Sequence, residues 1–168
     1  LARELQHQGA EVAFVCRHHP GNRIDDLRQE GFIVHELPAP DDQRHQEDGD
    51  YATWLGVSQT QDAAETIAVL SDKPDWLIVD HYVLDREWEQ RLRPYTARLM
   101  VIDDLANRDH DCDVLLDQNY TTDPESRYNG RVPPEAIRLL GPRYALLQPE
   151  YAACRAQVTA RPGHVRRI

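Results

Sequence analysis

Short apolar clusters alternate with amphipathic stretches along most of the chain. Apolar runs such as 11–16 (EVAFVC) and 75–80 (DWLIVD) predict buried strands, and apolar positions spaced three or four residues apart predict helices. Gly9 and Gly31 each follow a predicted helix and directly precede a strand, which is typical of short helix-to-strand connections. The alternation predicts an α/β protein with a mainly parallel sheet.

The pattern gives bounds for each element. Strands are predicted over 11–16, 32–37, 75–80, 98–103, 113–116 and 137–140, and helices over 1–8, 22–30, 58–73, 85–95, 124–129 and 148–157. We expect the first five strands to form one parallel sheet with helices on both faces. The run 75–80 is apolar almost throughout, so both of its faces are expected to be buried. Segment 38–50 carries two prolines and many charges and predicts a surface loop.

Composition narrows the class of protein. The 168 residues are enough for one domain, and a net charge of −10 argues against a nucleic-acid partner. No apolar run is long enough to span a membrane, and no segment resembles a signal peptide. Cys16, Cys112 and Cys154 are odd in number and far apart, which favours reduced thiols in a cytoplasmic protein.

The two ends of the chain predict a fragment. The sequence starts in helical pattern at Leu1 without an initiator Met, and it finishes with basic residues that run into the apolar Ile168. We therefore expect residues 1–168 to be most of one domain of a longer protein.

Polar residues follow three successive predicted strands, as DHY at 80–82, DDL at 103–105 and DQN at 117–119. Ligands of open parallel sheets bind beyond the carboxyl ends of the strands. Four side chains are therefore expected on one cleft-facing surface: Asp80, Tyr82, Asp104 and Asn119. The alternative is that Asp ends strands because it begins turns and caps helices.

The tripeptide at 80–82 combines a carboxylate, an imidazole and a phenol, which together offer acid, base and hydrogen-bond chemistry. Consecutive side chains on a strand point to different sides, so the three cannot all face one substrate atom. The structural alternative is that His81 hydrogen-bonds a loop carbonyl and Tyr82 packs its ring under a helix.

Neither a metal nor a nucleotide cofactor is predicted. The acidic, histidine and cysteine residues within 103–112 fit no zinc or EF-hand spacing, so structural use is favoured, with Asp104 as a cap and His110 anchoring the loop before Val114. The chain has no P-loop, no G-x-G-x-x-G and no G-x-S-x-G motif.

Three blocks of sequence resemble one enzyme family. The blocks are VDHY at 79–82, VIDDLANR at 101–108 with CDVLLDQNY at 112–120, and GPRYALL at 141–147 before PEY at 149–151. Together they are similar to the UDP-sugar hydrolases of pseudaminic acid biosynthesis, which act on UDP-2,4-diacetamido-2,4,6-trideoxy-β-L-altropyranose. The resemblance runs in register along the whole chain.

The resemblance implies a MurG-like GT-B protein with two Rossmann-like domains, of which this chain is the N-terminal one. It implies release of UDP by water without metal or cofactor, with the UDP-sugar as the partner. The family's catalytic His, in a G-x-G-H segment, would precede Leu1, and the UDP-gripping domain would follow Ile168. The first strand would then be missing between the strands at 11–16 and 75–80, which would leave a gap or a forced pairing there.

The resemblance also suggests roles for individual residues. Tyr82 matches the family tyrosine beside the reacting sugar, and with His81 it is the catalytic candidate. The residues expected to bind substrate are Asp80, Asp104, Asn119 and Tyr144. Gln148 stands where an Arg is common, so a phosphate contact is not expected at that position.

Two other functions fit the same pattern. One is a glycosyltransferase of the same fold, in which an acceptor hydroxyl replaces water, because fold alone does not separate the two reactions. The other is a non-catalytic module that binds a sugar nucleotide or a protein. The sequence makes no prediction of oligomeric state.

Overall fold

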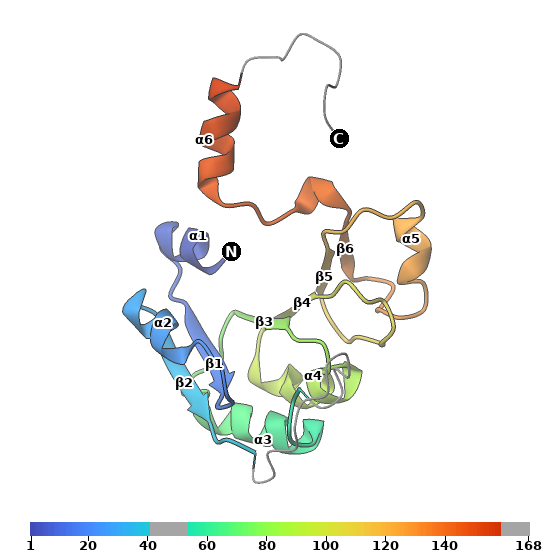
Figure 1. Ribbon diagram of the computed structural model, residues 1–168. Helices are drawn as coiled ribbons and strands as arrows, with labels where there is room; N and C mark the ends of the chain where they lie inside the picture. Colours follow the sequence, from blue (N-terminus) through green and yellow to red (C-terminus); the bar gives the residue numbers. More distant parts are fainter. Residues whose placement is uncertain (41–53, 159–168) are drawn as a thin grey trace.

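A computed structural model describes residues 1–40 and 54–158, and in these ranges parallel strands alternate with helices (Figure 1). The predicted α/β class is confirmed, and the parallel sheets flanked by helices are consistent with a Rossmann-like domain. In the same ranges no helix is both long and apolar enough to cross a membrane.

The elements lie close to their predicted bounds. The strands are β1 (Ala13–Arg17), β2 (Ile33–Leu37), β3 (Trp76–Asp80), β4 (Arg98–Ile102), β5 (Val114–Asp117) and β6 (Ile137–Leu140). The helices are α1 (Ala2–His7), α2 (Ile24–Gln29), α3 (Gln59–Val69), α4 (Arg86–Leu92), α5 (Pro124–Arg127) and α6 (Pro149–Gln157), with short 3₁₀ turns η2 (Arg93–Tyr95) and η3 (Pro142–Tyr144). The predicted helix 85–95 ends earlier because Pro94 falls in η2. Most of the predicted loop 38–50 lies outside the described residues.

The strands form two separate sheets. β1 pairs with β2, and β3, β4, β5 and β6 pair in that order, all in parallel. The prediction of one continuous sheet through β1 and β3 is therefore wrong for the described residues. The interruption lies between β1 and β3, where a gap or a forced pairing was expected.

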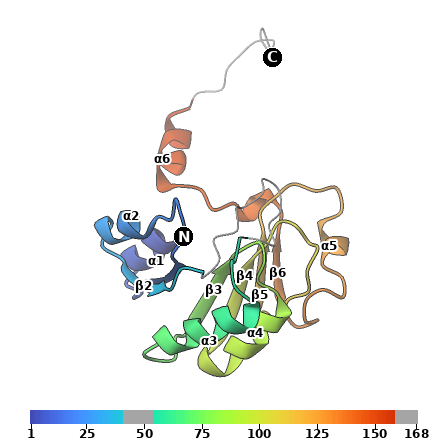
Figure 2. The same cartoon turned by 60° about the horizontal axis from the view of Figure 1, so that its bottom comes forward.

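One face of the four-stranded sheet is covered by α3 and α4 (Figure 2). Val79, Leu99 and Leu115 point to this face and pack with Trp88 and Leu92 of α4 in the main core. These side chains are at most 5% exposed. Burial of this apolar layer is the main driving force that holds the helices on the sheet.

The opposite face of β3 is open. Trp76 and Ile78 are 41% and 36% exposed, although β3 is apolar up to its last residue. The prediction that both faces of this strand are buried is therefore wrong. The guanidinium of Arg98 lies over the Trp76 ring, 5.4 Å from its centroid, and covers part of the indole.

A buried ion pair joins the two sheets through α3. Arg17, at the end of β1, donates from Nη2 to Asp62 of α3 at 2.7 Å, and both side chains are almost fully buried. Asp62 also accepts a hydrogen bond of 2.8 Å from the indole nitrogen of Trp88 on α4. This carboxylate therefore fixes α3 against both β1 and α4.

Replacing Trp88 with phenylalanine should lower the free energy of unfolding by about 2 kcal/mol, because it removes a hydrogen bond to a buried carboxylate while keeping most of the ring. Urea denaturation measures the change. Trp76→Phe is the matched control, since that indole is exposed, and it should change stability by less than about 0.5 kcal/mol. Equal effects of the two substitutions would show that the Trp88–Asp62 bond contributes nothing.

Candidate functional site

The ends of β3, β4 and β5 meet at one edge of the sheet. Asp80 pairs with Ile102 across β3 and β4, and Ile102 pairs with Leu116 across β4 and β5. Because all three strands are parallel, the polar residues after them follow at the same edge. We call this edge, formed by residues 80–82, 103–108 and 117–119, the polar rim. The sequence predicted this grouping.

Asp80, Asp104 and Asn119 come together at the polar rim. The side-chain amide of Asn119 donates to Asp104 Oδ2 at 3.2 Å. Asp104 Oδ1 is shielded from solvent and has no hydrogen-bond partner in the described part of the chain. Partial desolvation raises the pKa of Asp80, and the negative charge of Asp104 adds to this effect. The rim therefore presents carboxylate acceptors close to an amide donor.

His81 is held with one ring nitrogen occupied. Its Nδ1 accepts from the backbone N–H of Val83 at 3.1 Å, and its backbone carbonyl accepts from Arg108 Nη1 at 3.3 Å. Burial lowers the pKa of His81, and the positive charge of Arg108 adds to the effect. A neutral ring that accepts at Nδ1 carries its proton on Nε2, so this atom is a donor. The Nδ1 bond of His81 is therefore to a backbone N–H and not to a loop carbonyl.

Tyr82 lies against another aromatic residue. Its ring meets Trp54 edge to face, with centroids 5.6 Å apart and an interplanar angle of 73°. Trp54 precedes α3, and the side chain of Tyr82 remains 37% exposed. This exposure leaves part of the phenol accessible to a ligand at the polar rim.

Tyr144 lies at the same edge of the sheet, on the side of β6. It ends η3, directly after β6, and the N–H of Gly141 donates to the Asp117 carbonyl at 2.7 Å. The guanidinium of Arg143 lies 4.9 Å from the centroid of the Tyr144 ring. The structure thus places Tyr144 beyond β5, whereas Asp80 ends β3 and the other three residues, His81, Asp104 and Asn119, follow β3, β4 and β5.

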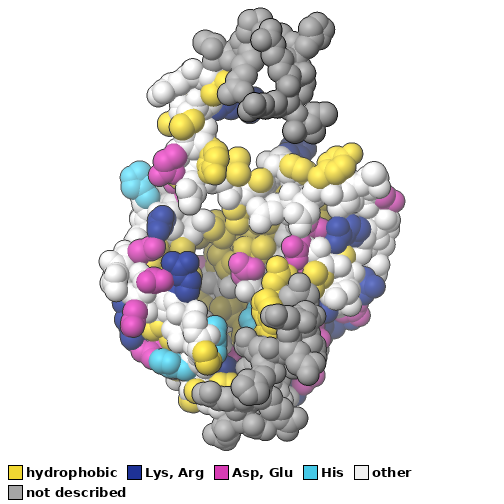
Figure 3. Space-filling model, viewed as in Figure 1, with side chains coloured by type: hydrophobic (Ala, Val, Ile, Leu, Met, Phe, Trp, Pro, Cys, Tyr) yellow, Lys and Arg dark blue, Asp and Glu magenta, His cyan; other side chains and the backbone are white. Residues whose placement is uncertain are grey.

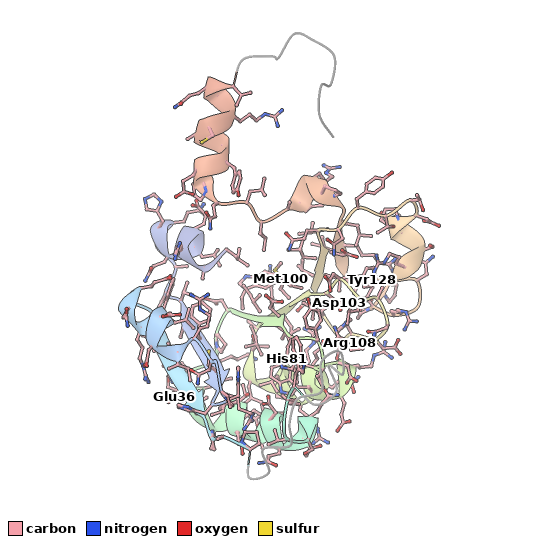
Figure 4. The ribbon with its side chains drawn as sticks, in the orientation of Figure 1. Glu36, His81, Met100, Asp103, Arg108 and Tyr128 are labelled. Carbon is pink, nitrogen blue, oxygen red and sulfur yellow. The ribbon has the colours of Figure 1, made fainter. Side chains whose placement is uncertain are left out.

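A buried polar network lies next to the polar rim and holds its residues in place (Figure 4). Tyr128 is fully buried, and its hydroxyl lies 3.1 Å from carboxylate oxygens of both Asp103 and Asp117. Arg108 forms an ion pair with Asp103 while it also contacts the His81 carbonyl. The network therefore ties the ends of β3, β4 and β5 to one another.

Asp103 and Asp104, which are neighbours in the sequence, have different roles. Burial alone would raise the pKa of Asp103, but His110, the backbone N–H of Ala106 and Arg108 hold it well below its usual range. Asp103 accepts from the N–H of Ala106 at 2.9 Å. The expectation that Asp104 caps this turn is wrong, because Asp103 does so.

His110 is fully buried between two carboxylates. Its Nδ1 donates to Glu89 Oε1 at 2.7 Å, and its Nε2 lies 3.8 Å from Asp103 Oδ2. Burial alone would lower its pKa, but these carboxylates raise the pKa of His110 to about 9. The backbone N–H of His110 donates to the Arg131 carbonyl at 2.7 Å, so the expected anchoring of the loop before Val114 is confirmed.

Stability should fall as the pH rises from about 6.5 to about 9. The folded-state pKa of His110 lies above its unfolded value, so its contribution is complete below pH 6.5 and lost above pH 9. The shift corresponds to up to about 3 kcal/mol. Urea midpoints measured from pH 6 to pH 9 check this. His110→Gln should flatten the profile, whereas His7→Gln, on the exposed α1, should keep it.

Few features of the sequence indicate the buried partners of His110 and Asp103. Glu89 shares the apolar face of α4 with Trp88 and Leu92, and a lone carboxylate on such a face is the one available signal. Tyr128 follows a four-residue helix and has no such pattern. Within the described ranges, no group of three or more His, Cys, Asp or Glu is arranged to hold a metal ion.

Two comparisons with known proteins identify no relative of this chain. A scan against models of protein families and a search of curated proteins both give no match. These comparisons therefore identify no family for the chain.

Proposed function

We propose that this chain is the sugar-facing domain of an enzyme that hydrolyses a UDP-linked 2,4-diacetamido-2,4,6-trideoxy sugar to the free sugar and UDP. In this proposal the product feeds the synthesis of pseudaminic acid or a related nonulosonic acid. The observation that carries the proposal is that the DHY and DDL blocks, distant in sequence, follow neighbouring parallel strands at one edge.

The chemistry of the polar rim suits such a sugar. Acetamido groups present both an N–H donor and a carbonyl acceptor. The carboxylate of Asp80, an exposed residue, can accept from an N–H, and His81 Nε2 can donate to a carbonyl. The match of acceptors and donors supports a substrate that carries amide substituents.

The same edge also suits cleavage at an anomeric carbon. Positive charge develops on the sugar in the transition state, and UDP is already a good leaving group. The carboxylates of Asp80 and Asp104 stabilise that positive charge, and the Tyr82 hydroxyl orients the sugar or the attacking water. In this account the residues of the chain supply electrostatic stabilisation and positioning, without a pair of carboxylic acids at the bond that breaks.

The test is the release of UDP by the complete enzyme that contains residues 1–168, assayed without any acceptor in ¹⁸O-labelled water. A hydrolase forms UDP and places one ¹⁸O atom on the anomeric carbon. A glycosyltransferase forms UDP at a useful rate only when an acceptor is added, and a binding module forms none. Either of these last two results would overturn the proposal. Excess EDTA should leave hydrolysis unchanged, since no metal takes part.

A further inference from the structure

Trp54 and Tyr82 form a corner of two aromatic rings next to the polar rim, and the hydrolysis described above gives Trp54 no role. The two rings meet edge to face, with an interplanar angle of 73°. In this arrangement the rings do not cover each other's faces as stacked rings do. Trp54 is 41% exposed and Tyr82 is 37% exposed. We call this pair the aromatic corner, and it presents apolar ring surface to a ligand.

The backbone that follows Trp54 is held in place by packing. Leu55 is buried and belongs to the main core. Gly56 has a φ of +70°, which favours glycine, and any side chain at this position would collide with the ring of Pro40. The close approach of Gly56 to Pro40 leaves this turn little freedom to move. The indole of Trp54 is therefore carried by a fixed piece of backbone.

Hydrogen bonds tie the start of α3 to the segment that follows the polar rim. The backbone N–H of Asp85 donates to Gln59 Oε1 at 3.1 Å, and the hydroxyl of Thr60 donates to Glu87 Oε1 at 3.0 Å. These bonds hold the beginning of α3 against the beginning of α4. The two rings of the aromatic corner come from the segments just before these helices, so the bonds preserve the distance between the rings.

The aromatic corner adjoins polar groups of the rim. Asp80 ends β3 and is exposed, and His81 directly precedes Tyr82. Figure 3 shows hydrophobic side chains together with acidic and histidine side chains on this face of the molecule. Sites for small molecules typically combine aromatic and apolar surface with a few polar groups that fix orientation. This combination fits a sugar that carries both amide and alkyl substituents.

We propose that the aromatic corner binds the methyl group at C6 of the sugar and that Trp54 determines specificity for 6-deoxy sugars. The choice of this ligand rests on the proposed function, in which the acetamido groups of the sugar face Asp80 and His81. A methyl group has no hydrogen-bond donor or acceptor, so its transfer from water to a ring surface is favourable. A hydroxyl at C6 would give up hydrogen bonds with water on the same surface.

A nucleobase is the other flat ligand that stacks on aromatic side chains. Charge favours the sugar over the nucleotide at this place. A nucleotide would bring its phosphates near the carboxylate of Asp80, and like charges repel, whereas the sugar ring is uncharged. The aromatic corner is therefore assigned to the sugar.

Substrate discrimination by the complete enzyme that contains residues 1–168 tests this assignment. The two substrates are the UDP-linked 2,4-diacetamido-2,4,6-trideoxy sugar and its analogue with a hydroxyl at C6, and UDP release gives kcat/KM for each. The wild type should prefer the 6-deoxy sugar by about 10- to 100-fold. Trp54→Ala should bring this ratio near unity, mainly by raising KM for the 6-deoxy sugar, and Trp54→Phe should retain part of the preference.

Trp76→Ala is the matched control, because Trp76 is equally exposed but starts β3, at the opposite end from the polar rim. It should leave the ratio unchanged. A preference for the 6-deoxy sugar that survives in Trp54→Ala would overturn the proposal, and so would a wild type without any preference.

Saturation-transfer NMR tests the aromatic corner without turnover. Aromatic protons of the protein are irradiated in the presence of the free 2,4-diacetamido-2,4,6-trideoxy sugar. The C6 methyl should receive more saturation than the acetyl methyls, and this excess should disappear in Trp54→Ala and persist in Trp76→Ala. If Trp54→Ala does not fold by circular dichroism, Trp54→Phe and the wild-type pattern decide.

The two experiments separate this inference from the proposed function. Strong saturation of the C6 methyl without UDP release from either substrate would overturn the hydrolysis and leave the aromatic corner in place. Saturation that is stronger at the acetyl methyls, or absent, would overturn the aromatic corner even if UDP is released. Displacement of the sugar by uridine would also overturn it, since a nucleobase would then occupy the rings.

Discussion

Replacing Asp103 with alanine is expected to lower the free energy of unfolding by about 3–5 kcal/mol. The substitution removes the carboxylate that faces Arg108, Tyr128 and His110, and all three partners are largely or fully buried. A buried cation left without its counter-charge costs far more than an exposed one. It also leaves the backbone N–H of Ala106 without an acceptor. Urea denaturation at pH 7 measures the loss.

The neighbouring Asp104→Ala is the matched control. Asp104 sits one position further along the same turn, and the hydrogen bond to its carboxylate comes from the exposed Asn119. Its removal should change the free energy of unfolding by less than about 1 kcal/mol. A large loss with Asp104→Ala, or a small one with Asp103→Ala, would contradict the division between a supporting network and a ligand-facing rim.

Replacing Tyr82 with phenylalanine is expected to lower kcat roughly 10- to 1000-fold in the complete enzyme, if the hydroxyl takes part in acid–base or orienting work. A phenol with no special environment ionises near pH 10, so at neutral pH it acts as a donor. The substitution removes that donor and keeps the ring that packs against Trp54. Rates of UDP release at saturating substrate check this.

Two comparisons separate chemistry from packing at Tyr82. Tyr95→Phe removes a hydroxyl from another exposed tyrosine in η2, which leads into β4 and so lies away from the polar rim, and it should leave kcat unchanged. Tyr82→Ala should reduce stability by less than the 3 kcal/mol or so typical of a buried ring, because the side chain is partly exposed. Normal turnover in Tyr82→Phe would remove this residue from the mechanism.

Local patterns were enough to place the strands and helices. The apolar run at 75–80 and the glycines that end α1 and α2 have direct physical causes within a few residues. The exposure of Ile78 could not be predicted in this way, because it depends on what lies beside β3. The periodicity of a strand indicates which of its side chains are apolar. It does not indicate which other element packs against them.

The polar rim was predictable to a similar extent. The parallel arrangement dictates that Asp80, Asp104 and Asn119 meet, and the sequence shows each of them after an apolar run. The distinction between Asp103 and Asp104 was not predictable, because it depends on Tyr128 and His110. These partners come from distant segments of the chain, and only the fold brings them to Asp103.

The central claim is that the sugar binds at the carboxyl ends of β3, β4 and β5. The most direct test is to map amide chemical-shift changes by NMR on residues 1–168 while the UDP-linked diacetamido sugar is added. We expect changes clustered at 80–82, 104–108 and 117–119, and none at the opposite edge around 70–73 and 94–95. Changes confined to that opposite edge, or no change at millimolar sugar nucleotide, would contradict it.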